Sequence, residues 1–180
     1  MNTWLNIEDN NSEHTYEYEE LLLMMAIYHD VGGSHSTAVA AHIHTNQLPM
    51  EVTPTKEELL QIKTFDRMEK KDQGHLIYIG RDEMGVDVYT VSRQYQPHLV
   101  LNAIRDTYRI CKGTMDGLYI FGTMPAVNLW MKIGGYSSRR LKLVSFGRPI
   151  VTYGTLKAYP DLVRIVRDAK KRIAEDLKNS

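Results

Sequence analysis

Residues 21–28, LLLMMAIY, form an apolar run without polar alternation, and Gly32 and Gly33 follow shortly afterwards. Such a run is typical of a strand covered on both faces, although periodicity alone does not distinguish it from a buried helical turn. The glycines favour the strand. Residues 36–47 then carry apolar side chains at helical spacing. The first unit is therefore predicted to be a strand, a tight loop and a helix.

Strand-like and helix-like segments alternate along the rest of the chain. Thr55 and Glu58 have the spacing of a capping box, and Asp82 and Gly85 supply turn residues between two β-rich runs. The expected elements are a helix at 55–62, an antiparallel hairpin at 75–92, a helix at 97–112, a strand at 117–122, a helix at 125–134, strands at 141–147 and 149–154, and a helix from Pro160. This order predicts a three-layer αβα domain with a mostly parallel sheet and one or two antiparallel strands.

Composition narrows the class of protein. The chain has 180 residues, which suits one α/β domain at 20–180, preceded by a polar segment at 1–19 that we expect to be a flexible lead-in. Lys plus Arg equal Asp plus Glu at 22 each, so no overall field would attract nucleic acid or an anionic membrane. Cys111 is the single cysteine, which excludes an internal disulfide. With no signal-like segment, we expect a cytoplasmic protein, whose oligomeric state the sequence does not define.

The first loop is the candidate binding site. Where a buried strand turns through glycines into a helix, backbone N–H groups and the helix dipole favour an anion, and such loops lie at the carboxyl ends of the strands. The alternative is that the loop only turns the chain and caps the helix, with Ser34 or Ser36 as the N-cap. The predicted ligand-binding residues are Gly32, Gly33, Ser34, His35, Ser36 and Thr37, with Arg139 and Arg140 as charge partners.

The loop differs from the phosphate-binding P-loop that it partly resembles. A P-loop has a lysine before its Ser or Thr, and here Ser36 stands before Thr37. This difference argues against ordinary nucleoside-triphosphate hydrolysis, although His35 or a distant arginine could supply the missing charge.

Other polar residues have two interpretations each. His29, Asp30 and His35 could meet as metal ligands or as an acid/base pair, but their spacing matches no known metal motif. We therefore expect no bound metal and a buried His29 that is hydrogen-bonded to backbone. We expect His42 and His44 to be partly exposed helix residues. Asp82, Glu83 and Arg148 are expected to be turn residues. Arg139 and Arg140 are expected either to bind an anion or to lie at a solvated helix end.

Four segments together resemble a bacterial family of uncharacterised proteins, domain of unknown function 3189, typical of endospore-forming Firmicutes. The segments are YHDVGGSHSTAVAAHIH, PTKEELLQIKTFDRM, DQGHLIYIGRDEMGVDVYTV and GGYSSRRLKLVSFGRPIVTYGTLKAYPDLVRIV. The resemblance implies a small intracellular protein of sporulating bacteria and transfers no catalytic residue or cofactor. Family loops often have Cys, Tyr or Thr where this chain has Asp30, Val31 and Ser34, which argues against a cysteine nucleophile.

Three functions fit these residues. The first is binding of a nucleotide or another phosphorylated small molecule at the Gly-rich loop, with catalysis left open. The second is a hydrolase in which His29, Asp30 and His35 hold a metal or move protons while loop amides stabilise an oxyanion. The third is a regulatory or interaction protein without catalysis, in which the loop serves only as a cap.

Overall fold

The structure, a computed structural model, describes residues 24–140 and 143–179. The expected lead-in at 1–19 and the first residues of the expected strand at 21–28 lie outside these ranges. No helix within them combines the length and the apolar character that crossing a membrane requires.

Four strands form one mixed sheet in the order β2-β3-β1-β4. They are β1 (Met25–Asp30), β2 (Leu76–Arg81), β3 (Asp87–Ser92) and β4 (Leu118–Gly122). The central strand β1 pairs in parallel with both β3 and β4, whereas β2 pairs antiparallel with β3. The predicted mostly parallel sheet with its antiparallel hairpin is confirmed.

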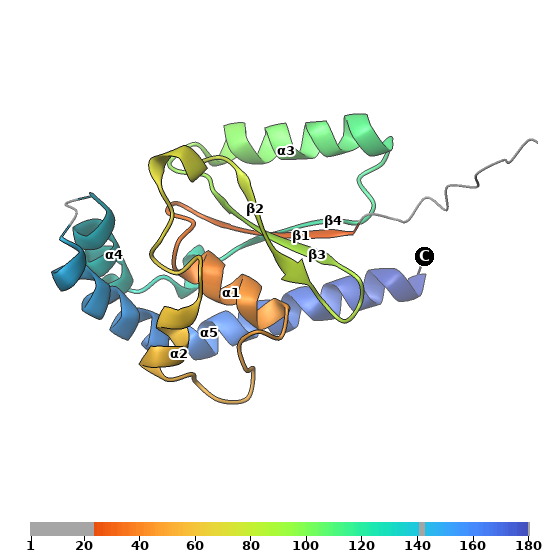
Figure 1. The fold of residues 1–180 in the computed structure, drawn as a ribbon. Coiled ribbons are helices and arrows are strands. Elements are labelled where there is room, and N and C mark those ends of the chain that lie inside the picture. The colour runs from red at the N-terminus through yellow and green to blue at the C-terminus, as the bar shows by residue number, and fades with distance from the viewer. Residues whose placement is uncertain (1–23, 141–142, 180) are drawn as a thin grey trace, which may run out of the picture.

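Helices cover both faces of this sheet, which gives the three expected layers (Figure 1). Helix α2 begins with the predicted capping box between Thr55 and Glu58, and α3 begins at Pro97 as expected. The α-helices are α1 (Ser36–His44), α2 (Lys56–Gln61), α3 (Pro97–Lys112), α4 (Leu129–Gly135) and α5 (Val144–Asn179). The short helical turns are η1 (Lys70–Asp72), η2 (Met124–Ala126) and the π-helical η3 (Tyr136–Arg140).

After the neighbouring strands β1 and β3, the chain continues to opposite faces of the sheet. Strand β1 leads into α1, which packs against α5 on one face of the sheet. Strand β3 leads into α3, which lies alone on the other face (Figure 1). Adjacent parallel strands whose following helices lie on opposite faces define a topological switch point, here at the carboxyl ends of β1 and β3.

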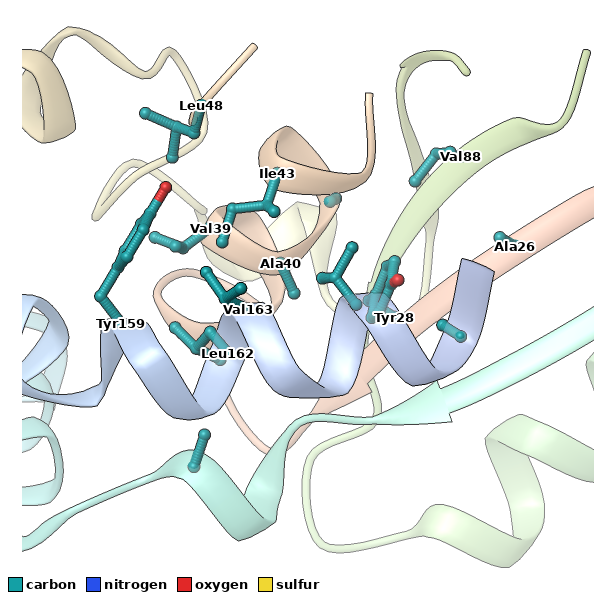
Figure 2. Close-up of a cluster of buried hydrophobic side chains, with 14 of the residues drawn as sticks. Ala26, Tyr28, Val39, Ala40, Ile43, Leu48, Val88, Tyr159, Leu162 and Val163 are labelled. Carbon is teal, nitrogen blue, oxygen red and sulfur yellow. The ribbon is translucent and has the colours of Figure 1, made fainter. Parts of the chain in front are cut away.

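The main core lies between the sheet and the pair α1 and α5. Figure 2 shows Val39, Ala40 and Ile43 of α1 facing Leu162 and Val163 of α5, with side chains of β1 and β3 beside them. All five of these residues are at most 6% exposed. Burial of aliphatic side chains of this size contributes about 1.5–3 kcal/mol each, so this contact holds α5 against the sheet.

The two strands predicted at 141–147 and 149–154 are wrong. From Val144 on, these residues belong instead to α5, a single helix that runs to Asn179 and contains Pro149 and Pro160. The helix predicted from Pro160 is therefore only its second half. Two prolines, two glycines and several β-branched residues suggested strands and turns, because each lowers helix propensity.

Packing against α4 explains how α5 tolerates these residues. A Cβ at Gly147 would lie 2.3 Å from the backbone N of Ser138, and one at Gly154 would lie 2.8 Å from that of Met131. On the facing helix, a Cβ at Gly134 would lie 2.4 Å from the backbone N of Val151. The glycines thus allow the two backbones to approach closely, and this contact outweighs their low helix propensity.

A buried polar network joins β1, α1 and the β2–β3 turn. The Nδ1 atom of His44 lies 2.7 Å from the Tyr28 hydroxyl, and its Nε2 atom lies 3.0 Å from a carboxylate oxygen of Asp82. An ionised carboxylate only accepts hydrogen bonds, so Nε2 of His44 donates to Asp82. Nδ1 of His44 then accepts a hydrogen bond from the Tyr28 hydroxyl. Burial raises the pKa of Tyr28 well above 10.0, which keeps this hydroxyl protonated.

The network corrects one expectation and confirms another. His44 and His42 are fully buried or nearly so, not partly exposed. Asp82 is the turn residue that the sequence predicted, because it also accepts hydrogen bonds from the backbone N–H groups of Met84 and Val86. Glu83, beside it, is exposed and pairs with Lys170.

Replacing Asp82 by Ala should lower the free energy of unfolding by about 3 kcal/mol, because His44 and two backbone amides lose a buried acceptor. The adjacent change Glu83→Ala is the matched control and should cost less than about 1 kcal/mol, since it removes contacts of an exposed carboxylate with Lys170 and Asn46. Urea unfolding measures both. Equal losses in the two variants would contradict a structural role for the buried network.

Candidate functional site

The loop between β1 and α1 lies at the carboxyl edge of the sheet, and its innermost donors bind a carboxylate of the chain itself. Asp30, the last residue of β1, accepts hydrogen bonds from the backbone N–H of Gly33 and from the Ser36 hydroxyl. The Thr123 hydroxyl, which follows β4, donates to the Ser36 oxygen at 2.9 Å. All three side chains are buried. The interior of the loop is thus already occupied by an anion.

The two loop glycines have different roles. Gly33 has φ +72°, and a Cβ there would lie 2.7 Å from Cβ of Ser92 and 2.8 Å from Sδ of Met68. Its missing side chain is required by the backbone conformation and by packing against β3. Gly32 is exposed, and a Cβ there would have no atom within 4 Å. Of the two, Gly32 is the one that faces open space.

Helix α1 has no side-chain cap. Its N-cap residue is His35, which makes no capping hydrogen bond, so the expectation that Ser34 or Ser36 caps the helix is wrong. The first N–H groups of an α-helix have no partner inside the helix. Within the described residues the buried Thr37 hydroxyl also has no hydrogen-bond partner. The start of α1 therefore keeps hydrogen-bonding capacity that residues 24–140 and 143–179 do not use.

His35 is oriented by a buried ion cluster outside the loop. Its Nε2 atom donates to Asp66 at 3.1 Å, and Asp66 also accepts from the Ser138 hydroxyl at 2.9 Å and from Nε of Arg148 at 3.0 Å. The side chain of Asp66 is 0% exposed, whereas that of Arg148 is 41% exposed. Three separate segments, namely the loop, η3 and α5, thus meet at one carboxylate.

The hydrogen bonds of this cluster keep Asp66 ionised. Burial alone would raise the pKa of its carboxyl, but the hydrogen bond and charge interaction with His35 and the hydrogen bonds from Arg148 and Ser138 outweigh burial. The net effect lowers the pKa from 3.8 to about 2. An ionised Asp66 fixes the His35 ring beside the loop, since a carboxylate only accepts hydrogen bonds and the contact therefore requires a proton on Nε2.

A second basic group lies on the other side of the loop. Nε of Arg93, the residue after β3, donates to Nδ1 of His29 at 3.1 Å. Burial first, then the nearby Arg93, and more weakly Arg105, lower the pKa of His29, against the opposing effect of Asp30. The expectation that His29 bonds to backbone is wrong, because its ring nitrogen accepts from a guanidinium.

His29, Asp30 and His35 do not meet as the second functional alternative requires. Each is bound to a different partner: Arg93, the Ser36 hydroxyl and Asp66 respectively. Within residues 24–140 and 143–179, no group of three His, Cys, Asp or Glu side chains is placed to hold a metal ion. The side chains of Arg139 and Arg140 lie outside what the structure describes, so their predicted role stays a prediction.

Comparison with known families matches residues 25–171 to the family described as protein of unknown function (DUF3189). The chain belongs to this family. The resemblance found in the sequence is thereby confirmed, and the match covers the sheet, the loop and most of α5. No curated protein and no solved structure matches this DUF3189 protein.

Sequence reasoning missed three charged residues of the site. Arg148 was expected in a turn, and Asp66 and Arg93 carried no motif. Each lies next to the loop only because the fold brings it there. The one signal near Arg93 was its position directly after an expected strand, where ligand-binding side chains of α/β proteins gather.

The pKa of Asp66 predicts an acid-sensitive contribution to stability. Because the folded pKa lies below the unfolded value, the contribution is present above about pH 4 and is lost as the pH falls toward 2. At about 1.4 kcal/mol per pKa unit, wild-type protein should lose about 2 kcal/mol more over this range than Asp66→Asn, which tolerates the same backbone conformation (φ +54°). Urea unfolding at several pH values tests this, and identical pH profiles for the two proteins would contradict it.

Proposed function

We propose that this DUF3189 protein binds a phosphorylated small molecule, such as a nucleotide, at the carboxyl edge of its sheet. The observation that carries the proposal is the switch point between β1 and β3, whose following helices lie on opposite faces. Ligands of open α/β sheets bind at such points. The Gly-containing loop and the uncapped start of α1 lie at this position.

The donors proposed for such a ligand lie in the loop, at the start of α1 and directly after β3. The dipole of α1 and its first N–H groups favour a negative group. The Thr37 hydroxyl lacks a protein partner among the described residues, and His35 is held beside the loop by Asp66. Arg93 supplies a cation from β3. Arg139 and Arg140, which directly follow the Asp66-bound Ser138, are proposed as further charge partners.

Asp30 determines where the phosphate would bind. Its carboxylate already accepts hydrogen bonds from the Gly33 amide and the Ser36 hydroxyl, so these two donors are not free for a ligand. A phosphate would instead contact the exposed side of the loop at Gly32, with Ser34 and His35 next to it. This arrangement differs from a P-loop, in which the loop interior holds the phosphate.

The two glycines give a sharp test of this position. Gly32→Val should leave stability nearly unchanged, because a Cβ at this position has no atom within 4 Å, but should weaken binding at least tenfold by occupying the ligand's place. Gly33→Ala is the matched control and should lower the melting temperature by several degrees, since its Cβ clashes with Ser92 and φ is positive.

Calorimetric titration of wild type and variants with inorganic phosphate and with nucleoside mono-, di- and triphosphates gives the measurement. Arg93→Ala should also weaken the same ligand, because a hydrogen bond to a charged group contributes about 1.5–3 kcal/mol. If wild type binds none of these compounds, or if Gly32→Val binds them as tightly as wild type, the proposal is wrong.

The contact between His35 and Asp66 favours hydrolysis of the bound phosphoester as a second candidate. A histidine held by a buried carboxylate is the usual arrangement for a side chain that transfers protons to or from water and a leaving group. Wild type should then release phosphate from a compound that it binds, and His35→Gln should abolish release while keeping binding within a few-fold. Binding without release by wild type would exclude this candidate and leave the first.

A further inference from the structure

A cavity lies beside the end of α1 that is opposite the loop. It has a volume of about 530 Å³ and is bordered by the end of α1, the segment after it, α2 with the turn that follows, and β2. Its apolar wall includes Leu48, Ile62 and Ile79, of which Leu48 and Ile62 are at most 7% exposed. Polar side chains, among them His42, Gln61 and Thr64, line the rest of the cavity, and its volume suits a small organic molecule that such groups would orient.

His42 offers this cavity a hydrogen-bond acceptor. Its Nδ1 atom lies 2.8 Å from the carbonyl oxygen of Ala38, and since a carbonyl only accepts, Nδ1 carries the proton. Burial lowers the pKa of His42, so the ring is neutral near pH 7. In this tautomer Nε2 has a free lone pair, and none of the hydrogen bonds between described residues uses it.

Thr64 offers a second, independent polar group. It also lines the cavity, and its hydroxyl oxygen is buried without a hydrogen-bond partner among the described residues. A buried hydroxyl without a partner costs about 1–3 kcal/mol. Rotation of the Thr64 side chain toward a ligand in the cavity would let the hydroxyl bond to that ligand and would remove the cost.

The rim of the cavity indicates the class of ligand. Tyr78 of β2 lines it and is 55% exposed, which leaves an aromatic surface open to a flat molecule. Glu58 and Lys63 carry opposite charges on the same rim, so no net charge selects an ion. We propose that this cavity, the His42 pocket, binds an uncharged aromatic or heteroaromatic molecule that donates an O–H or N–H hydrogen bond to Nε2 of His42 and bonds to the Thr64 hydroxyl.

The site is separate from the loop at the start of α1 and does not rest on phosphate binding there. Phenol, indole and benzimidazole serve as probes, because each combines an apolar ring with one donor. Toluene and N-methylindole are the matched compounds without a donor. Methyl-group NMR spectra of the full chain report binding through the signals of Leu48, Ile62 and Ile79.

The donor-bearing probes should shift these signals at millimolar concentration, and the matched compounds should bind roughly 3- to 10-fold more weakly, as one neutral hydrogen bond predicts. Two nearly isosteric variants test the partners: His42→Phe, which removes the acceptor, should show the same loss for all three donor-bearing probes, and Thr64→Val should show it for phenol and benzimidazole, which can also accept a hydrogen bond. Thr53→Val, an exposed threonine outside the cavity, is the control and should bind like wild type.

Stability gives a readout that is independent of the probes. Thr64→Val should be as stable as wild type or more stable, because its hydroxyl has no partner in the free protein. The proposal is overturned if no probe shifts the signals of the His42 pocket in wild type, or if donor-bearing and matched compounds bind equally well. Unchanged binding in both His42→Phe and Thr64→Val would overturn it as well.

Discussion

The carboxylate of Asp66 joins three parts of the chain that lie far apart in the sequence. It binds His35 of the loop, Ser138 of η3 and Arg148 of α5, and its backbone N–H donates to the carbonyl of Ser34. Removing any one partner would leave part of a buried charge uncompensated, which is costly in a low-dielectric interior. The position of the C-terminal helices relative to the loop therefore depends on this ion, and so does the orientation of His35.

The charges around the loop are arranged in two shells. The inner shell is the carboxylate of Asp30, bound by the Gly33 amide and the Ser36 hydroxyl. The outer shell is cationic, with Arg93 on the side of β3 and Arg148 on the side of α5. An anion approaching from solvent would meet the cations before the buried carboxylate. The proposed anion site would rely on these cations in place of the lysine of a P-loop.

Local sequence patterns predicted the sheet and the helices before residue 135. The capping box of α2, Pro97 at the start of α3 and Gly113 with φ +72° at its end act within a few residues, so they are visible in the sequence. The first half of α5 was missed because Gly147 and Gly154 serve a contact with α4. Nothing near them in the sequence reveals that contact.

The same limit explains what was predicted of the site. The loop was found because its glycines and hydroxyl residues are contiguous. Asp66 was not, because its partners lie 31, 72 and 82 positions away along the chain. Arg93 and His29 are 64 positions apart. Contacts between residues so far apart in the sequence depend on the completed fold. A single sequence therefore shows the residue types but not which of them are in contact.

The central place of β1 has a consequence for how the chain reaches its native state. Both partners of β1 come later in the sequence, and the second of them, β4, ends only at Gly122. At ribosomal rates of about 5–20 residues per second, this apolar strand would wait roughly 5–20 seconds after its own synthesis before its second neighbour exists. During translation the nascent chain thus exposes a strand with two open edges, which makes it a natural client for chaperones and the segment most exposed to aggregation.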